Sequence, residues 1–357
     1  GAGSLLAACG GGGGSSADVR WGNWTLYLDY DSNKKVYPTL EEFTAKTKTT
    51  VKYLEDYNDN DEFYGKVQGQ LKLKKDIGYD LICPTDWMAA RYIRLGYAQK
   101  FDKANIPNSK NILPALASVP YDTGRDYSLT WQGIMGGFTW NKEKLPKGIH
   151  TLEELFVPAN KGKIEVLTEL RDTVGVIMMA QGVDITKFTK DQYYNALDFL
   201  QKKIADGFIR QVKGNDYKED LISGDAVACI AWSGDAFQLA AENDGKFEFA
   251  IPESGGTISA DNFVIPSTAT AETKPKVEKL INYYYDPVVA AKVAAYVNYI
   301  TPVQGAQAAM EKIDPTLVDN ELIFPSAKTQ SKLHVFRNLT PAEETEFTDA
   351  FQKATGN

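Results

Sequence analysis

Val51-Lys52-Tyr53-Leu54 and, further along the chain, Tyr79-Asp80-Leu81-Ile82-Cys83 are short runs of residue types that favour β-strands. Between them, residues 62–73 carry apolar side chains at helical spacing, which predicts an amphipathic helix. A strand, a helix and a second strand in this order form a βαβ unit, the building block of parallel sheets. This part of the sequence therefore predicts an α/β fold.

The pattern extends towards the N-terminus and resumes in the second half of the chain. Residues 25–29 predict a first strand, and residues 39–46 predict a helix with Thr39 as N-cap and Glu42 closing a capping box. After Trp140 the alternation predicts strands at 163–167 and 226–231 and helices at 173–181 and 192–206. With 357 residues the chain exceeds most single hydrophobic cores, so the repeated pattern indicates two α/β lobes.

The composition is that of a globular protein with an acidic balance. Hydrophobic residues make up 43% and charged residues 24% of the chain, and the net charge is -8. An acidic chain lacks the concentrated Lys and Arg that displace counterions from nucleic acids, so we expect no nucleic-acid partner. The negative field suits a cationic ligand, although such a balance also serves solubility.

The N-terminal residues resemble the lipid-attachment site of bacterial lipoproteins. Leu6-Ala7-Ala8-Cys9 has the form of a lipobox, and the Gly/Ser-rich residues 10–16 are typical of a flexible tether. We expect Cys9 to carry lipid and the chain to begin inside its signal peptide; the alternative is an expression linker with an accidental cysteine. No stretch approaches the ~20 apolar residues of a membrane-spanning helix, so we expect membrane attachment only through this lipid.

The other two cysteines lie in predicted strands. Cys83 ends one strand, and Cys229 lies inside the strand at 226–231. We expect both to be small buried hydrophobic residues, with a disulfide between them as the alternative.

Acidic and aromatic residues directly follow the predicted strands. In open α/β sheets, ligands bind beyond the carboxyl ends of the strands. The residues at those ends are Asp29, Tyr30 and Asp31 after the first strand, Thr85, Asp86 and Trp87 after the third, Glu169 and Asp172 after the strand at 163–167, and Trp232 and Asp235 after the strand at 226–231. The sequence thus predicts a cleft lined by carboxylates and aromatic rings.

This combination of side chains suits an alkylammonium ligand. An ammonium group has three donors and no acceptor, so carboxylates satisfy it with charge-assisted hydrogen bonds. The faces of Trp and Tyr attract the cation by about 0.5 to 2 kcal/mol each and also cover the methylene chain between two amines.

Enzyme sites find little support in the sequence. The chain has only two histidines, His150 and His334, which leaves little material for a His-based triad or a His-rich metal site. It has no Gly-x-Ser-x-Gly elbow, and the glycines at 10–14 lack the Lys and the helix of a phosphate loop. A stretch at 56–67 that is similar to a calcium loop has Asp61 where Gly is required. We expect a binding protein without enzymatic activity, metal or cofactor.

Several separated segments of the sequence resemble the bacterial spermidine/putrescine-binding proteins, which serve ABC importers. The segments that carry the resemblance are 80–87 (DLICPTDW), 169–172 (ELRD), 231–235 (AWSGD), 259–261 (SAD) and 298–302 (NYITP). The resemblance covers nearly the whole chain, from about Trp24 to about Thr340.

The resemblance implies a type II periplasmic-binding fold, in which a ligand cleft lies between two interleaved lobes. The implied divisions are a signal remnant and tether at 1–19, a first lobe of 20–134 with 262–304, and a second lobe of 135–261 with 305–357.

The resemblance also implies which residues contact the ligand. Glu169 and Asp172 flank Arg171, which we expect to orient them; the alternative is that Arg171 binds a ligand carboxylate. The other implied contacts are Thr85, Trp87, Trp232, Asp261 and Tyr299, and Asp86 joins them from its place at a strand end.

The sequence departs from the family at two places. Asp29, Tyr30 and Asp31 stand where an aromatic patch is usual, and Ser259 stands where an aromatic residue often precedes the acid at Asp261. We expect residues 29–31 to replace the missing contacts. The ligand is then expected to differ in length or in number of amines from the best-known cases.

By this resemblance the protein is expected to be an extracytoplasmic, lipid-anchored solute-binding protein of an ABC importer. It would bind a polyamine such as putrescine or spermidine, close its lobes around it and deliver it, as a monomer, to the permease subunits. The alternatives are a sugar, or another small amine or zwitterion such as γ-aminobutyrate, betaine or an amino acid. A zwitterion would need Arg171 turned into the cleft.

Overall fold

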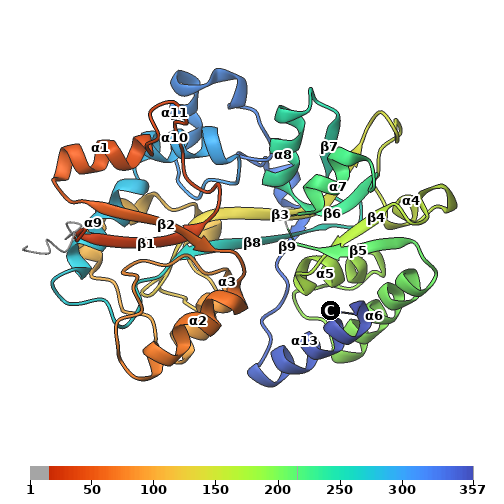
Figure 1. Cartoon of the computed structure of the whole chain (residues 1–357), viewed down its shortest axis with the longest axis horizontal. Helices are drawn as coiled ribbons and strands as arrows, with labels where there is room; N and C mark the ends of the chain where they lie inside the picture. Colours follow the sequence, from red (N-terminus) through yellow and green to blue (C-terminus); the bar gives the residue numbers. More distant parts are fainter. Residues whose placement is uncertain (1–15, 215, 357) are drawn as a thin grey trace, which may run out of the picture.

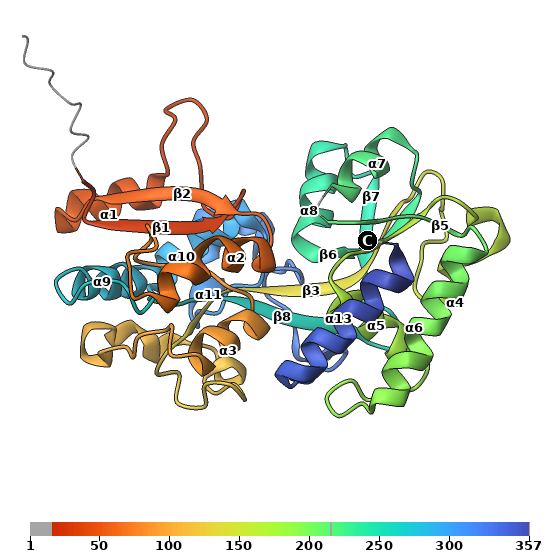
Figure 2. The same ribbon diagram turned by 60° about the horizontal axis from the view of Figure 1, so that its bottom comes forward.

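The computed structural model describes residues 16–214 and 216–356, which form two α/β lobes side by side (Figures 1 and 2). Each lobe has its own hydrophobic core, as the repeated pattern in the sequence predicted. Two strands, β3 (Leu129–Asn141) and β8 (Gly256–Phe263), run side by side from one lobe into the other.

The first lobe is built on a short parallel sheet. β1 (Val19–Trp24) pairs with β2 (Val51–Tyr57), and Leu81 extends the pairing by a bridge to Trp21. Its helices are α1 (Pro38–Thr47), α2 (Asn60–Lys72), α3 (Asp86–Arg94), α9 (Lys274–Tyr284), α10 (Pro287–Val297) and α11 (Ala306–Ile313), with 3-10 turns at Lys103–Asn105, Pro107–Asn111, Pro114–Leu116 and Pro315–Leu317.

The second lobe contains most of a seven-stranded sheet of order β5-β4-β6-β3-β8-β9, with β7 also paired to β3. Its further strands are β4 (Ile164–Leu167), β5 (Ile209–Lys213), β6 (Ala228–Trp232), β7 (Phe247–Ala250) and β9 (Leu333–His334). Its helices are α4 (Leu152–Leu155), α5 (Leu170–Ala180), α6 (Lys190–Ala205), α7 (Tyr217–Ser223), α8 (Ser233–Glu242), α12 (Ala327–Gln330) and α13 (Pro341–Thr355), with a 3-10 turn at Pro158–Asn160.

The seven-stranded sheet is mixed, whereas the sequence predicted a parallel sheet. β4 runs parallel to β5 and β6, but β3 is antiparallel to β6, β7 and β8. Periodicity did not reveal β3 because its middle is rich in glycine. A side chain at Gly136 would place its Cβ 2.3 Å from Thr257 Oγ1 and 2.9 Å from Asp172 Oδ1, so the close approach of these side chains requires glycine there.

The prediction of a strand at residues 25–29 was wrong. The strand lies earlier, at Val19–Trp24, where Val19 and Trp21 are fully buried and thus define the inward face. The chain then turns at Leu26, which has a φ of 56° and is 52% exposed. The hydrophobic residues that suggested a strand at 25–29 belong to this turn and to the segment after it.

The prediction of Thr39 as the N-cap of the first helix was also wrong. α1 begins at Pro38 after Tyr37, so Thr39 lies inside the helix. Asp29 accepts hydrogen bonds from Thr39 N at 2.9 Å and from Thr39 Oγ1 at 2.6 Å. A carboxylate from the preceding loop thus satisfies the first turn of the helix.

The chain crosses between the lobes a third time, and this crossing lies later in the sequence than the expected one near Gln304. Ala306, Met310 and Ile323 pack in the core of the first lobe, because α11 packs against α10. The next residue in the core of the second lobe is Phe336. We therefore propose lobe boundaries near residues 134 and 261 and between 323 and 336.

Both cysteines within the described residues are free and fully buried, as expected. Cys83 lies in the core of the first lobe and Cys229 in the core of the second, which rules out the alternative of a disulfide between them. The expected lipid-attachment residue, Cys9, lies outside the described residues. None of the helices in the described part of the chain combines the length and apolar character needed to span a membrane.

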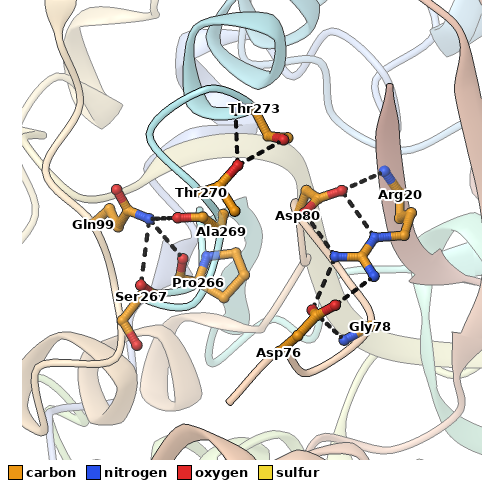
Figure 3. Close-up of polar contacts among 10 residues, drawn as sticks. All are labelled: Arg20, Asp76, Gly78, Asp80, Gln99, Pro266, Ser267, Ala269, Thr270 and Thr273. Atoms are coloured by element: carbon orange, nitrogen blue, oxygen red, sulfur yellow. Dashed lines mark hydrogen bonds and ion pairs between the residues drawn. The ribbon is translucent and has the colours of Figure 1, made fainter. Parts of the chain in front are cut away.

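Polar side chains fix the loops of the first lobe that lead to the site (Figure 3). Arg20, on β1, binds Asp76 through two nitrogens at 2.9 Å each and Asp80 through Nε at 3.1 Å and Nη2 at 2.9 Å. Gln99 Nε2 donates to the carbonyl oxygens of Pro266 at 3.1 Å and Ala269 at 2.7 Å. These contacts hold the segments that precede Leu81 and follow β8.

Candidate functional site

One face of β8 carries polar side chains at every second position. Thr257, Ser259 and Asp261 lie on the same face because side chains alternate along a strand, and we call them the interlobe row. Thr257 Oγ1 donates to Asp172 at one end of the row, and Thr85 Oγ1 donates to Asp261 at the other. Thr257 and Asp261 are four residues apart, so their Cα atoms are separated by about 13 Å. Two carboxylates thus mark the ends of a row that runs between the lobes.

Asp261 is buried and bound by neutral groups on both oxygens. It accepts from Tyr27 Oη at 2.7 Å and from Thr85 Oγ1 at 2.6 Å, and it is 3% exposed. Asn60 Nδ2 donates in turn to Thr85 Oγ1 at 2.9 Å. Burial raises the pKa of Asp261 to about 7, although the two hydroxyl groups oppose this shift.

Asp172 occupies the first turn of α5 and is also buried. Trp232 Nε1 donates to it at 2.8 Å, and Thr257 Oγ1 donates at 2.6 Å. Burial, followed by the charge of Glu169, raises the pKa of Asp172 to about 6. Both ends of the interlobe row therefore hold a carboxylate whose charge is costly without a cation.

A third buried acid, Asp235, lies in the first turn of α8. Tyr217 Oη donates to it at 2.8 Å, and Lys218 Nζ lies 3.3 Å from its other oxygen. The ring of Tyr299 packs on the preceding residue, Gly234, where an added Cβ would lie 2.2 Å from the ring. Burial raises the pKa of Asp235, and the charge of Lys218 opposes this shift.

Aromatic rings connect these acids. Tyr27, which donates to Asp261, packs edge-on against Tyr299 with 5.2 Å between the ring centroids. Tyr299 belongs to the segment after α10, and Trp232 ends β6 just before α8. Tyr27, Tyr299 and Trp232 thus contact the three buried acids or the residues next to them.

The family of this chain follows from comparison with known proteins. The profile of the bacterial extracellular solute-binding proteins matches residues 39–324. The chain belongs to this family.

Several relatives of this solute-binding protein share most of its length. A spermidine/putrescine-binding periplasmic protein of Salmonella typhimurium is 30% identical over 323 residues, covering 89% of this chain and 88% of that protein. The putrescine-binding periplasmic protein PotF of Escherichia coli is 24% identical over 349 residues, covering 93% of this chain and 89% of that protein. Both relatives are named as binding proteins, in agreement with the expectation of a binding protein rather than an enzyme.

Solved structures support the type II two-lobe fold of the solute-binding protein. The spermidine/putrescine ABC transporter substrate-binding protein PotD of Streptococcus pneumoniae superposes with a TM-score of 0.79 at 21% identity, covering 95% of this chain and 98% of that chain. The TpPotD lipoprotein of Treponema pallidum gives a TM-score of 0.78 at 17% identity, covering 95% and 99%.

Trp87 and Arg171 meet across the lobes of the solute-binding protein. The Arg171 guanidinium carbon, from α5, lies 4.1 Å from the ring centroid of Trp87, from α3, and Arg171 Nη1 is 3.0 Å from Glu169 Oε1. Arg91, also on α3, pairs with Glu344 on α13 at 3.0 Å. A groove of about 250 Å³ opens beside these contacts. Arg171 thus binds its neighbour Glu169 and covers Trp87.

Asp86, the first residue of α3, lies next to Trp87 and has a structural role. It accepts from Tyr121 Oη at 2.6 Å, from Asn262 Nδ2 at 2.9 Å and from the backbone nitrogen of Ala260 at 2.8 Å. These bonds fasten the start of α3 to β8 beside Asp261. Asp86 therefore positions the interlobe row.

The side chains of residues 29–31, which were predicted to contact the ligand, bind or pack on residues outside the interlobe row. Asp29 caps α1, as described above. Asp31 accepts from the backbone nitrogens of Asn33 at 2.9 Å and Lys34 at 3.1 Å, which closes a turn. Tyr30 is 37% exposed and packs on Tyr37 with 5.0 Å between centroids. The structure does not bring these three side chains into the interlobe row.

Two residues of the site were missing from the sequence-based selection of ligand contacts. Tyr27 follows β1 by three residues, and a correct placement of that strand would have marked it as a strand-end aromatic. Asp235 stands at a predicted strand end but is not among the predicted ligand contacts. Its place on the first turn of α8, three residues after Trp232, was the available signal.

Proposed function

We propose that this solute-binding protein carries a polyamine between its lobes. The observation that carries the proposal is the pair Asp172 and Asp261, buried at the two ends of the interlobe row and hydrogen-bonded by neutral side chains. A ligand with an ammonium group at each end would supply the two missing charges. The relatives named above are spermidine- or putrescine-binding proteins, which supports the same class of ligand.

The aromatic rings suit the middle of such a ligand. Methylene groups between two amines need apolar cover, and ring faces provide it while attracting the neighbouring cations. We assign this role to Tyr27 and Trp232, which donate to the two acids, and to Tyr299, which packs on Tyr27. In this proposal Glu169 adds negative charge at the Asp172 end, and Thr85 orients Asp261.

The position of Arg171 disfavours a zwitterionic ligand. A ligand carboxylate would need a free guanidinium in the cleft. Arg171 instead bonds to Glu169 and stacks on Trp87 from the other lobe.

The family and the two-lobe fold also support a wider role in import. In this proposal the ligand bridges both lobes and favours their closed arrangement, which the permease subunits of an ABC importer then recognise. The protein would act as a monomer on the outer side of the cytoplasmic membrane or in the periplasm. A lipid on Cys9 would hold it at the membrane.

A thermal-shift panel tests the ligand class. Putrescine and spermidine should raise the midpoint of unfolding in a concentration-dependent manner, because a ligand that binds only the folded state stabilises it. γ-Aminobutyrate, betaine and maltose should leave the midpoint unchanged. Stabilisation by one of these three, without any effect of a polyamine, would overturn the proposal.

A further inference from the structure

The three buried acids of the site differ in their partners. Asp172, Asp235 and Asp261 are 5%, 2% and 3% exposed, respectively. Among these three, only Asp235 has a cation of the described chain within 4.0 Å, the ammonium of Lys218 at 3.3 Å. The hydrogen bonds to Asp172 and Asp261 come from Trp, Tyr and Thr side chains.

Lys218 reaches Asp235 from α7, a helix that begins next to the acid. Tyr217, the first residue of α7, binds one oxygen of Asp235, and Lys218, the second, lies near the other. The Lys218 side chain is 23% exposed, so its stem leads from the surface to the buried acid. Lys218 thus places an alkylammonium against Asp235 as an amine ligand would.

Asp235 belongs to the same site as the other two acids. It follows Trp232, the donor to Asp172, by one turn of chain, and Tyr217 Oη accepts from the Trp232 backbone nitrogen at 3.2 Å. On its other side, the Tyr299 ring that packs on Gly234 contacts Tyr27, the donor to Asp261. A ligand lying along the interlobe row would therefore pass close to the acid that Lys218 neutralises.

We infer that Lys218 is a specificity-determining residue that fills one of three anionic positions with the chain's own ammonium. The ligand then needs to supply only two charges, which favours diamines such as putrescine over triamines such as spermidine. This inference rests on the proposed function. A third ammonium would have to compete with Lys218 or remain next to its positive charge, which costs affinity.

The test compares the ratio of the dissociation constants for putrescine and spermidine in the wild type and in Lys218→Ala, by calorimetry. The variant removes the ammonium and leaves space at Asp235, so the ratio should shift towards spermidine by at least tenfold. Lys218→Arg keeps the charge and should keep the wild-type preference. Lys213→Ala is the matched control, because Lys213 is 24% exposed and pairs with Asp216 at 3.0 Å in the same region of the chain.

The outcomes separate the two proposals. If the wild type binds neither amine, the proposed function fails and the inference fails with it. If the wild type binds and the ratio in Lys218→Ala shifts less than threefold, only the inference is overturned.

The double variant Lys218→Ala/Asp235→Asn should lose the shift, and a shift that persists without the Asp235 carboxylate would also overturn the role of Lys218. Should Lys218→Ala fail to fold, Lys218→Gln gives the same comparison, with an expected shift of at least fivefold.

Discussion

At the scale of single residues, Asp261 combines its proposed binding role with a cost in stability. It is buried without a cation, and burial raises its pKa from the ordinary value of 3.8 to about 7. A raised carboxyl pKa means that the folded protein favours the protonated form. This acid therefore lowers the stability of the ligand-free protein progressively as the pH rises from about 4 through about 7.

Asp261→Asn should weaken polyamine binding and stabilise the ligand-free protein. Loss of the carboxylate from a buried ammonium should cost about 2 to 5 kcal/mol, which is ~30-fold or more in affinity. At pH 8 the free energy of unfolding without ligand should rise by roughly 1 to 4 kcal/mol, because the buried charge is gone, and at pH 4 this gain should vanish. Calorimetry and denaturant titration measure the two effects. An affinity change below threefold would remove Asp261 from the centre of the site.

The affinity for polyamines should fall as the pH falls below 7. Ammonium binding needs both carboxylates ionised, whereas the pKa values of Asp261 and Asp172 without ligand are about 7 and about 6. Binding at pH 6 should therefore release protons, and the dissociation constant should rise at least tenfold between pH 8 and pH 5. Calorimetry in two buffers of different ionisation enthalpy detects the released protons. Equal affinity at both pH values would contradict ionised partners.

At the scale of elements, the site depends on how α5 packs against the neighbouring strands β3 and β8. Gly136 lies where Thr257 and Asp172 approach β3, and its missing side chain lets them form their hydrogen bond. Trp232 plays a second role at this scale, since it ends β6, precedes α8 and donates to Asp172. Asp172, Trp232 and Asp261 are thus held by regular elements, whereas Tyr27 and Tyr299 lie in the segments that follow β1 and α10.

Gly136→Ala should destabilise the protein and weaken binding together. The added methyl group would lie within 2.9 Å of both Thr257 Oγ1 and Asp172 Oδ1, so overpacking should cost about 1 to 3 kcal/mol in the free energy of unfolding. Gly65→Ala is the control, because that position in α2 is open and alanine should stabilise the helix by about 0.5 to 1 kcal/mol. Thermal unfolding and calorimetry compare the two variants. Unchanged stability in Gly136→Ala would show that β3 has room there.

Trp232→Ala should lower the affinity and remove most of the ligand-induced change in tryptophan fluorescence. The indole both donates to Asp172 and provides a ring face near the ligand, so its loss leaves a buried oxygen unpaired. Trp232→Phe keeps a ring but not the donor and should retain an intermediate affinity. Fluorescence titration with putrescine measures both variants, and wild-type behaviour in Trp232→Ala would place this residue outside the site.

At the scale of the whole molecule, the two lobes are joined by the chain segments that pass from one to the other and by side-chain contacts between the lobes. Arg91 pairs with Glu344, and Trp87 is covered by Arg171. Both contacts join α3 of the first lobe to helices of the second. In the proposed function they would favour the closed arrangement together with a ligand that bridges Asp172 and Asp261.

Saturating putrescine should reduce the radius of gyration, and Glu344→Gln should reduce this effect. Glu344 is buried and pairs across the lobes, so its neutralisation leaves Arg91 with a weaker partner and should cost several-fold in affinity. Glu346→Gln is the matched control, because Glu346 pairs with Lys190 at 2.6 Å inside the second lobe. Small-angle scattering with and without ligand compares the three proteins. A constant radius despite binding would contradict lobe closure.

The alternation of strands and helices and the acids at strand ends were readable from the sequence, because they depend on local spacing. Periodicity indicated the strand before Glu169 and Asp172 and the strand before Trp232, and it thereby located half of the candidate site. Resemblance to a family added Asp261 and Tyr299. Local pattern failed at β1 and β3, where a turn with apolar residues and a glycine-rich strand concealed the true boundaries.

The partners of these acids were decided only by the tertiary structure. Tyr27 and Asp261 are 234 residues apart in sequence, and Trp232 and Asp172 are 60 residues apart, so no local rule connects them. The same holds for Lys218 at Asp235 and for Arg171 over Trp87. Sequence determines which groups are available at the ends of the strands. Which acids receive a cation from the chain depends on the packing within each lobe, because burial and charge pairing are set by groups distant in the chain.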